Sequence, residues 1–195
     1  NPVNPVLGVK VQAGEEDLDF DLPAPLPLPW QRSYVSSNAH IGWLGQGWST
    51  PLSLFIEEKR SPRGKTLTLV DEFGREILFP PLRPGEQHFH DYEQVTLKCL
   101  QAGWFELSTP DQSRHLLFGR LAEGDKRHPL RAIIDRNDNI IRIHYDPAGG
   151  LPERITDSAG RILALHFETL PQQADATPAA KRLTRIDLIA GPGAW

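Results

Sequence analysis

The stretch from Tyr145 to Phe167 reads YDPAGGLPERITDSAGRILALHF. A polar turn from Asp157 to Arg161 separates two short runs that are rich in apolar and β-branched residues. An aspartate side chain caps such a turn, and a glycine such as Gly160 takes its left-handed position. The stretch therefore predicts two antiparallel strands joined as a β-hairpin.

The same unit recurs towards the N-terminus. Residues 134–143 read IDRNDNIIRI, residues 70–79 read VDEFGREILF, and residues 110–118, PDQSRHLLF, resemble a degraded copy. In each copy a strand ends in a polar turn, and a second strand begins directly after it. The chain is therefore expected to contain several hairpins of one kind.

The later copies follow each other at a fixed spacing. A distance of 22 residues separates three pairs of equivalent positions, Asp135 and Asp157, His144 and His166, and Tyr145 and Phe167. A period near twenty residues that is built from hairpins predicts a repeat architecture, in which each unit buries its apolar face on its neighbours. The recurrence of the two histidines favours an architectural place in the strand over catalysis.

The rest of the chain has the glycine and proline content that is typical of an all-β protein with many turns. Its 195 residues include 16 Gly and 18 Pro, and a hydrophobic share of 39% is enough for a folded core. Period-two alternation predicts strands at Leu18–Leu22 and Trp30–Val35 and a hairpin over residues 52–70. The alternation of Pro with Leu or Ala from Leu22 to Pro29 predicts polyproline II or an edge strand on an apolar surface. Sustained helical periodicity is missing, so we expect antiparallel hairpins that form a curved sheet.

Charge and cysteine content exclude several classes of function. The net charge is -4, and the 21 basic and 25 acidic residues are interspersed, which predicts no nucleic-acid partner. No apolar run reaches the ~18 residues of a membrane span, so we expect no membrane partner. Cys99 is the single cysteine and lies in an apolar alternation, where it is expected to be a small core residue.

Six segments carry a resemblance to a known family. Tyr145 to Arg161 resembles the YD repeat, with Gly150 in place of the usual Arg or Asn. The domain that opens the Rhs core is resembled by Pro2–Gly8, Asp17–Phe20, Leu22–Leu28, Trp30–Tyr34 and Gly42–Trp48. The chain is accordingly similar to the Rhs/YD-repeat polymorphic toxins over nearly its whole length, most loosely over residues 80–125. The resemblance implies an Rhs core N-terminal β domain at residues 1–125 and the first YD-type repeats at residues 126–195.

In that family the repeats spiral into a β-barrel cocoon around a C-terminal toxin, and many members are delivered by type VI secretion. The resemblance implies that this chain is a shell segment with no catalytic residue and no cofactor or metal. Its partners would be the remaining shell, the toxin domain and a secretion tail-spike protein or chaperone. The protein would stay in the bacterial cytoplasm before export into a target cell. A processing site is expected at Asn1 and Pro2. The residues with an expected structural role in the repeat motif are Asp71, Gly74, Arg75, Tyr145, Asp146, Asp157, Gly160 and Arg161.

Other groups of residues could carry chemistry, and each has a structural interpretation. His88 and His90 would share one face of a strand and could bind a metal, although Pro84 and Gly85 favour a loop. Paired carboxylates in the acidic run of residues 15–21 could act as in a glycosidase, or form a solvated face. The glycines of residues 42–48 lack the spacing and the following helix of a phosphate loop, which favours a structural turn.

The aromatic residues leave a rival function open. Trp30, Tyr34, Trp43, Trp48 and Trp104 could close the core of the first sheet or form an exposed platform for sugar. A carbohydrate-binding β-module is therefore the alternative function, and it predicts several exposed, coplanar tryptophans. A hydrolase is a second alternative, and it predicts a pocket with converging carboxylates. The shell interpretation predicts that the isolated chain self-associates through its last strand.

Overall fold

The computed structural model describes residues 3–4, 9–12, 18–62, 64–146, 150–169 and 181–191. These residues form strands, turns and loops, and they contain no helix. The prediction of an all-β fold is thus confirmed. Within the described ranges no helix is long and apolar enough to cross a membrane. The expected processing site at Asn1 and Pro2 and the acidic residues Glu15 to Asp17 lie outside the described residues.

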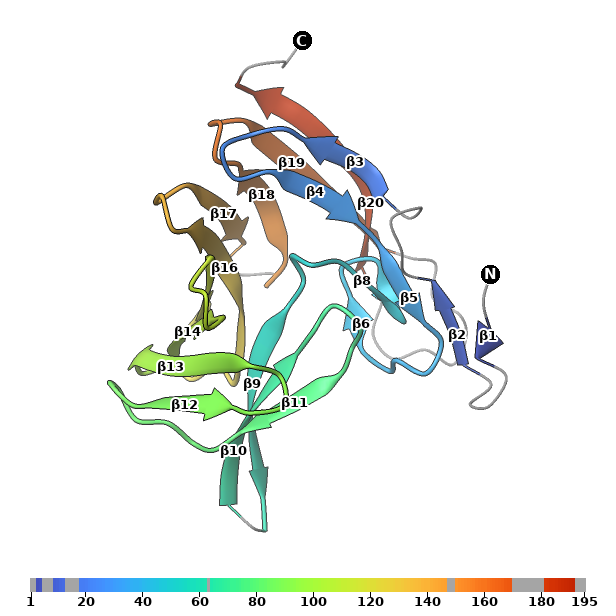
Figure 1. Cartoon of the computed structure of the whole chain (residues 1–195). Coiled ribbons are helices and arrows are strands. Elements are labelled where there is room, and N and C mark those ends of the chain that lie inside the picture. Colours follow the sequence, from blue (N-terminus) through green and yellow to red (C-terminus); the bar gives the residue numbers. More distant parts are fainter. Residues whose placement is uncertain are drawn as a thin grey trace.

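The N-terminal quarter of the chain forms three small sheets. Its strands are β1 Val3–Asn4, β2 Val9–Gln12, β3 Leu18–Leu22, β4 Leu28–Gln31, β5 Ser33–Val35, β6 Ile41–Gly42, β7 Gly45–Gln46 and β8 Trp48–Ser49. β1, β2, β5 and β8 pair in that order, while β3 with β4 and β6 with β7 form separate hairpins. In Figure 1 the ribbon of β3 and β4 lies across the strands at the C-terminal end of the large sheet.

The rest of the described chain forms one antiparallel sheet of twelve strands. They are β9 Phe55–Ser61, β10 Gly64–Val70, β11 Glu76–Phe79, β12 Gln87–His90, β13 Val95–Gln101, β14 Trp104–Ser108, β15 Arg114–Gly119, β16 Arg127–Asp135, β17 Ile140–Tyr145, β18 Pro152–Thr156, β19 Ile162–Thr169 and β20 Lys181–Ala190. From β12 to β20 each strand pairs with the next one in the chain, so spatial order follows sequence order. The sheet curves strongly (Figure 1), as the repeat pattern predicts.

The sheet forks at β16. Residues 127–129 of this strand pair with β9, while residues 130–135 pair with β15. β17 pairs with the same later half of β16, from Ala132 to Ile134. β9 continues through β10 to β11, so a three-stranded branch leaves the main path at this point. In the described residues the sheet remains open, so the expected barrel is not closed by this chain.

The concave side of the sheet is filled by the chain itself. Alternate residues of the sheet strands, such as Phe118, Ile143 and Ile155, point into one apolar core. Residues from the N-terminal part enter the same core, namely Leu26, Leu28, Trp30, Trp43, Leu52 and Leu54. Burial of these side chains removes a large apolar area from water, which is the main stabilising contribution in a fold of this kind.

Several local predictions can be compared with this structure. The strands at Leu18–Leu22 and Trp30–Val35 and the hairpin of β9 and β10 form near the expected bounds. The stretch from Leu22 to Pro29 does not run as polyproline II, because residues 23–27 make the turn between β3 and β4. Pro84 and Gly85 lie in a turn, as expected, but this turn ends before His88 and His90, which lie in β12. The boundary at residue 125 stays a prediction, and β15 and β16 on its two sides are paired.

Candidate functional site

The repeat turns share one geometry at the atomic level. In the turn at Asp157, Oδ1 accepts hydrogen bonds from the amides of Ala159 and Arg161, and Oδ2 accepts one from Nε of Arg161 at 2.6 Å. The Asp157 amide donates to the Arg161 carbonyl, and the Gly160 amide donates to the Asp157 carbonyl. A carboxylate in this place satisfies the backbone donors that a tight turn leaves without strand partners.

The turns at Asp71 and Asp135 repeat this pattern. Oδ1 of Asp71 accepts hydrogen bonds from the amides two and four residues later, and Oδ2 binds Nε of Arg75 at 2.7 Å. Asp135 makes the same contacts, with Nδ2 of Asn139 in place of the guanidinium at 2.9 Å. The fourth residue has a positive φ each time, 73° at Gly74, 61° at Asp138 and 81° at Gly160. Glycine adopts this conformation without the cost that a β-carbon adds.

The turn near Asp111 departs from the pattern. Its Oδ1 accepts from the Ser113 amide at 3.1 Å and from the Thr109 hydroxyl. Gln112 has the positive φ of 48°, directly after the aspartate instead of three residues later. Residues 110–118 are therefore a hairpin turn of another kind.

The turn at Asp157 holds the N-terminal ribbon against the sheet. Nη2 of Arg161 donates to the carbonyl of Pro23 at 2.8 Å. Oγ of Ser158 accepts from the amide of Leu26 and donates to its carbonyl, both at 2.9 Å. The Asp157 side chain is fully buried, and the Arg161 side chain is only 12% exposed. A guanidinium that binds both its own turn and a distant carbonyl connects the repeat to residues more than 130 positions away.

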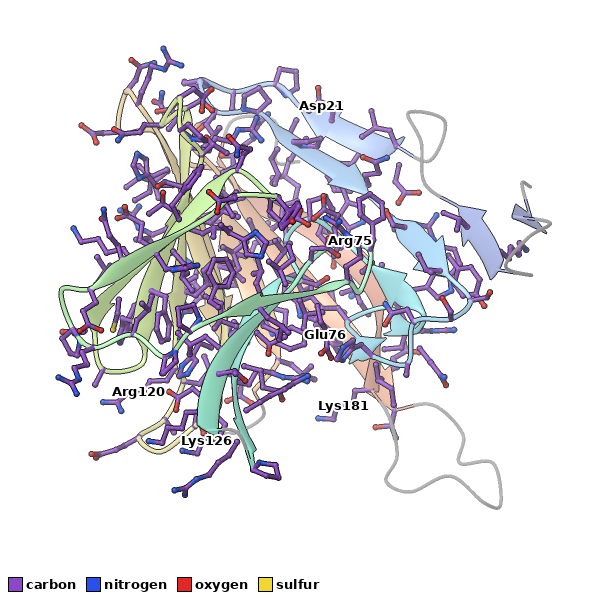
Figure 2. All side chains as sticks on the ribbon, turned by 60° about the horizontal axis from the view of Figure 1, so that its bottom comes forward. Asp21, Arg75, Glu76, Arg120, Lys126 and Lys181 are labelled. Carbon is purple, nitrogen blue, oxygen red and sulfur yellow. The ribbon has the colours of Figure 1, made fainter. Side chains whose placement is uncertain are left out.

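The turn at Asp71 makes equivalent contacts with the other N-terminal segments. The Ser49 hydroxyl donates to the carbonyl of Glu72. A β-carbon on Gly74 would lie 2.3 Å from the Asn38 side chain, so the backbone of the turn and Asn38 are in close contact. Arg75 also reaches Glu93 at 3.1 Å, and its bond to Asp71 raises the pKa of the guanidinium. Figure 2 shows Arg75 between the N-terminal strands and the large sheet.

The turn at Asp135 is self-contained. Asn139 donates through its side chain to Asp135 in the same turn, and this hydrogen bond is the main cause that lowers the pKa of Asp135. The amide of Asn139 is shorter than a guanidinium and lacks its further nitrogens, with which Arg161 reaches Pro23. The three turns thus differ in the residue that follows the left-handed position, which is Arg75, Asn139 or Arg161, and the two arginines also reach groups outside their own turns.

Tyr145 and Asp146 close the YD unit. The Tyr145 hydroxyl donates to the Leu130 carbonyl at 3.0 Å, and burial raises the pKa of this phenol. Its ring meets Trp43 edge to face at 6.3 Å between centroids. The Asp146 amide donates to the Leu151 carbonyl, and its carbonyl accepts from the Gly150 amide. These two residues therefore join β17, β18 and the N-terminal part.

The 22-residue spacing also repeats a β-bulge. β17 shifts register between His144 and Tyr145, and β19 shifts between His166 and Phe167. Nε2 of His144 lies 3.1 Å from the Thr156 hydroxyl, and Nε2 of His166 lies 2.9 Å from the Asp187 carboxylate. His144 is thus hydrogen-bonded to a hydroxyl on the next strand, and His166 lies close to a carboxylate on the next strand, each directly before the residue at which the register shifts.

The other candidate groups have structural contacts. His88 and His90 share one face of β12, and both rings pack on Phe79, at 6.2 and 5.4 Å between centroids. In the described part of the chain, no group of three or more His, Cys, Asp or Glu could hold a metal ion. Asp19 is exposed and binds Arg32 at 2.6 Å through both oxygens. Burial raises the pKa of the Cys99 thiol, which opposes the thiolate form.

A cavity of about 710 Å³ lies between residues 38–57 and the large sheet. Its walls include Trp43, Trp48 and the carboxylates of Glu57 and Asp71. Asp71 is bound within its own turn, and Glu57 lies 3.9 Å from Arg127, so both carboxylates have structural contacts. Of the described tryptophans none is exposed, which contradicts the exposed platform that a carbohydrate-binding module requires.

The sequence motifs did not indicate which residues connect the repeat turns to the N-terminal segments. Ser158, Ser49 and Asn38 hold the N-terminal segments in place, yet each is an ordinary polar residue in its local sequence. Their partners are distant in the chain. Ser158 stands directly after the turn aspartate, and this place in the motif was the one available signal.

Comparisons with known proteins agree with the repeat motifs. A family model described as a domain of unknown function (DUF6531) matches residues 1–79. Toxin protein Tse5 of Pseudomonas aeruginosa is 43% identical over 189 residues, which cover 86% of this chain and 14% of that protein. Double-stranded DNA deaminase toxin A of Burkholderia cenocepacia is 29% identical over 171 residues, which cover 87% of this chain and 12% of that protein.

Probable deoxyribonuclease RhsA of Dickeya dadantii is 30% identical over 171 residues, with the same coverage of 87% and 12%. The chain thus spans only 12–14% of the length of these relatives. Its match to proteins that are toxins or carry the Rhs name agrees with the YD motif at Tyr145 to Arg161 and with the opening segments of the chain. The chain belongs to the Rhs polymorphic toxin family.

Proposed function

We propose that this chain is a structural segment of an Rhs shell, which encloses the C-terminal toxin of the full protein for delivery by type VI secretion. The observation that supports this most directly is the strand order from β12 to β20, in which each strand pairs with the next one along the chain. A sheet that grows in this way can be extended by further hairpins without rearrangement.

Because the concave side of the sheet is filled by the N-terminal part of the same chain, this segment leaves no space there for a cargo. Leu28, Trp30 and Trp43 occupy the space that a cargo would need, and they are at most 8% exposed. A toxin therefore lies beyond this segment, against strands that follow in the full protein. This chain forms a section of the wall in which the N-terminal ribbon covers the inner face.

The role of such a segment is to form part of the shell wall and not to catalyse a reaction. Its partners are the rest of the shell, the toxin domain and a tail-spike protein or chaperone of the secretion system. The protein resides in the bacterial cytoplasm until export and then enters the target cell. Processing at Asn1 and Pro2 and the structural role of the motif residues belong to the same proposal.

The test uses the full-length protein and limited proteolysis. Trypsin should spare the C-terminal toxin region of the wild type, whereas Arg161→Ala, which frees Pro23 from the turn, should make that region susceptible. Arg142→Ala, an exposed arginine on β17, is the matched control and should leave protection intact. Strains that carry the Arg161 variant should also lose growth advantage in contact-dependent competition. Equal digestion of the toxin region in wild type and variant would contradict the proposal.

A further inference from the structure

The fork of the sheet contains a buried histidine. His128 lies in β16 between Arg127 and Pro129, in the segment that pairs with β9. Its side chain is 0% exposed. Two residues later, the Leu130 amide donates to the carbonyl of Leu54, and from Leu130 on β16 belongs to the main path of the sheet. His128 is therefore at the place where one strand changes partners.

The contacts of the ring satisfy only one of its two nitrogens. Nε2 lies 3.1 Å from Oε1 of Glu58 on β9, and the ring packs edge to face on Phe105 of β14 at 5.2 Å. Nδ1 is buried and has no hydrogen-bond partner in the part of the chain that the structure describes. In the neutral ring, Nε2–H donates to the Glu58 carboxylate and Nδ1 carries a lone pair. A second proton would place a buried N–H donor at Nδ1 with no acceptor among the described residues.

We propose that His128 is a pH-sensitive latch, whose protonation at Nδ1 weakens the pairing of β9 with β16 and opens the fork. Protonation and opening are linked because the ring is 0% exposed and its Nε2 lies beside Glu58 on β9. Separation of β9 from β16 would expose Nδ1 to water. The inference goes beyond the shell function and holds for this chain whatever the shell encloses.

Charged groups from every neighbouring element act on this proton. Glu58 on β9 and Asp125 in the loop before β16 favour the charged ring, whereas Arg120 opposes it. Lys126 lies 3.9 Å from Oε2 of Glu58 and thereby weakens the attraction of that carboxylate. The Cys99 thiol on β13 is neutral, since its own pKa is raised. Figure 2 shows Arg120 and Lys126 towards the same end of the molecule.

Burial outweighs the attraction of the carboxylates and lowers the pKa of His128 below its ordinary 6.5. The closed fork therefore binds a proton less tightly than the open fork does. The stability that this histidine contributes is fully present above pH 6.5. It decreases as the pH falls from 6.5 towards the lower pKa of the closed form.

Hydrogen exchange followed by mass spectrometry on the 195-residue chain tests the latch. Peptides that cover β9 and the first half of β16 are compared with peptides of β19 between pH 7.5 and pH 5, after correction for the intrinsic pH dependence. We expect the opening constant of the fork to rise about tenfold for each pH unit between 6.5 and the pKa of the closed form. The β19 peptides should not change. The proposal would be overturned if, after this correction, exchange rose equally in the fork and in β19, or if it did not rise at the fork.

Two variants assign the effect to the ring. His128→Gln removes the titration and should make the exchange at the fork independent of pH. The matched control is His115→Gln, because His115 also lies 3.2 Å from a glutamate, Glu106, but is half-buried on β15. This control should behave as the wild type does. A rise that persists in His128→Gln would contradict the latch.

Glu58→Gln serves if His128→Gln does not fold. Loss of the carboxylate removes the main attraction for the proton, so the pKa of His128 in the closed fork falls further. The acid-induced rise in opening should then continue to lower pH and reach a higher final value than in the wild type. An unchanged rise in Glu58→Gln would mean that another group controls the fork.

Discussion

Among the aspartates of the three equivalent repeat turns, Asp157 is the most deeply buried. It accepts three hydrogen bonds from its own turn while being fully buried. Asp157→Ala would leave two amides and the Arg161 guanidinium without their acceptor. We expect it to lower the free energy of unfolding by about 2–4 kcal/mol. The measurement is urea unfolding followed by tryptophan fluorescence.

Asp135→Ala is the matched control for this change. Asp135 makes the same contacts inside its turn but is bound to Asn139 instead of a buried arginine, and its turn is more exposed. Water can replace the lost acceptor there, so the decrease should be clearly smaller. An equal loss in the two variants would show that burial of the carboxylate does not decide the importance of a turn.

Substitution of the two glycines at the left-handed position distinguishes the effect of backbone strain from the effect of packing. Gly74 and Gly160 have φ values of 73° and 81°, so alanine is strained at either place by about 1–2 kcal/mol. At Gly160 a new β-carbon meets no atom within 4 Å, whereas at Gly74 it meets Asn38 at 2.3 Å. Asn38 is buried and its Oδ1 accepts from the His40 amide, so it cannot move freely.

We therefore expect Gly74→Ala to cost about 1–3 kcal/mol more than Gly160→Ala, through overpacking. Thermal unfolding by circular dichroism measures the difference as a lower Tm of the Gly74 variant. If both variants lose the same amount, the contact between this turn and Asn38 does not contribute to stability.

At the scale of elements, the ribbon of β3 and β4 acts as a cover for the large sheet. Leu28 on β4 is 1% exposed, and Leu18 at the start of β3 is 44% exposed. Leu28→Ala should lower the free energy of unfolding by about 2–5 kcal/mol, because it opens a cavity in the common core. Leu18→Ala should change it by no more than about 0.5 kcal/mol. Urea unfolding compares the two, and a small effect of Leu28→Ala would mean that the ribbon is not part of the cooperative unit.

The strands and their hairpins could be predicted from the sequence because their signals are local. Period-two alternation marks β3 and the pair of β9 and β10, and the turns that begin at Asp71, Asp135 and Asp157 mark the ends of β10, β16 and β18. The hairpin turn at residues 23–27 was missed, since alternating Pro and Leu fit an extended chain equally well. The clamp on Leu26 that makes this turn favourable comes from Ser158, far along the chain.

At the scale of the whole molecule, the sequence pattern does not predict that β16 pairs with β9 and so forks the sheet. β16 pairs with β9 because residues 127–129 face Phe55 to Glu57, a contact across about seventy positions. The filled concave side has the same origin, since Leu28 and Trp30 are as typical of a strand edge as of a core. Repeat motifs predict that strands stack in sequence order, but not which earlier segment covers their inner face.

The open edge of β20 is the last consequence of this architecture. Among the described strands β20 pairs along its length with β19 alone, and only the amide of Leu183 donates elsewhere, to the carbonyl of Trp43. Ile189, near the end of this strand, is 53% exposed. A long strand edge with apolar side chains pairs readily with another chain. We therefore expect the isolated chain to self-associate as its concentration rises.

Ile189→Lys should suppress this self-association without loss of the fold, because a charge on an edge strand opposes pairing of strands from two molecules. Sedimentation velocity over a range of concentrations is the measurement. Leu100→Lys is the matched control, since Leu100 is 40% exposed but lies on β13, which has partners on both sides. The control should associate as the wild type does. A wild-type chain that remains monomeric at every concentration would show that the edge of β20 is protected in some other way. It would then give no support to the proposal that a further hairpin of the shell pairs with this edge.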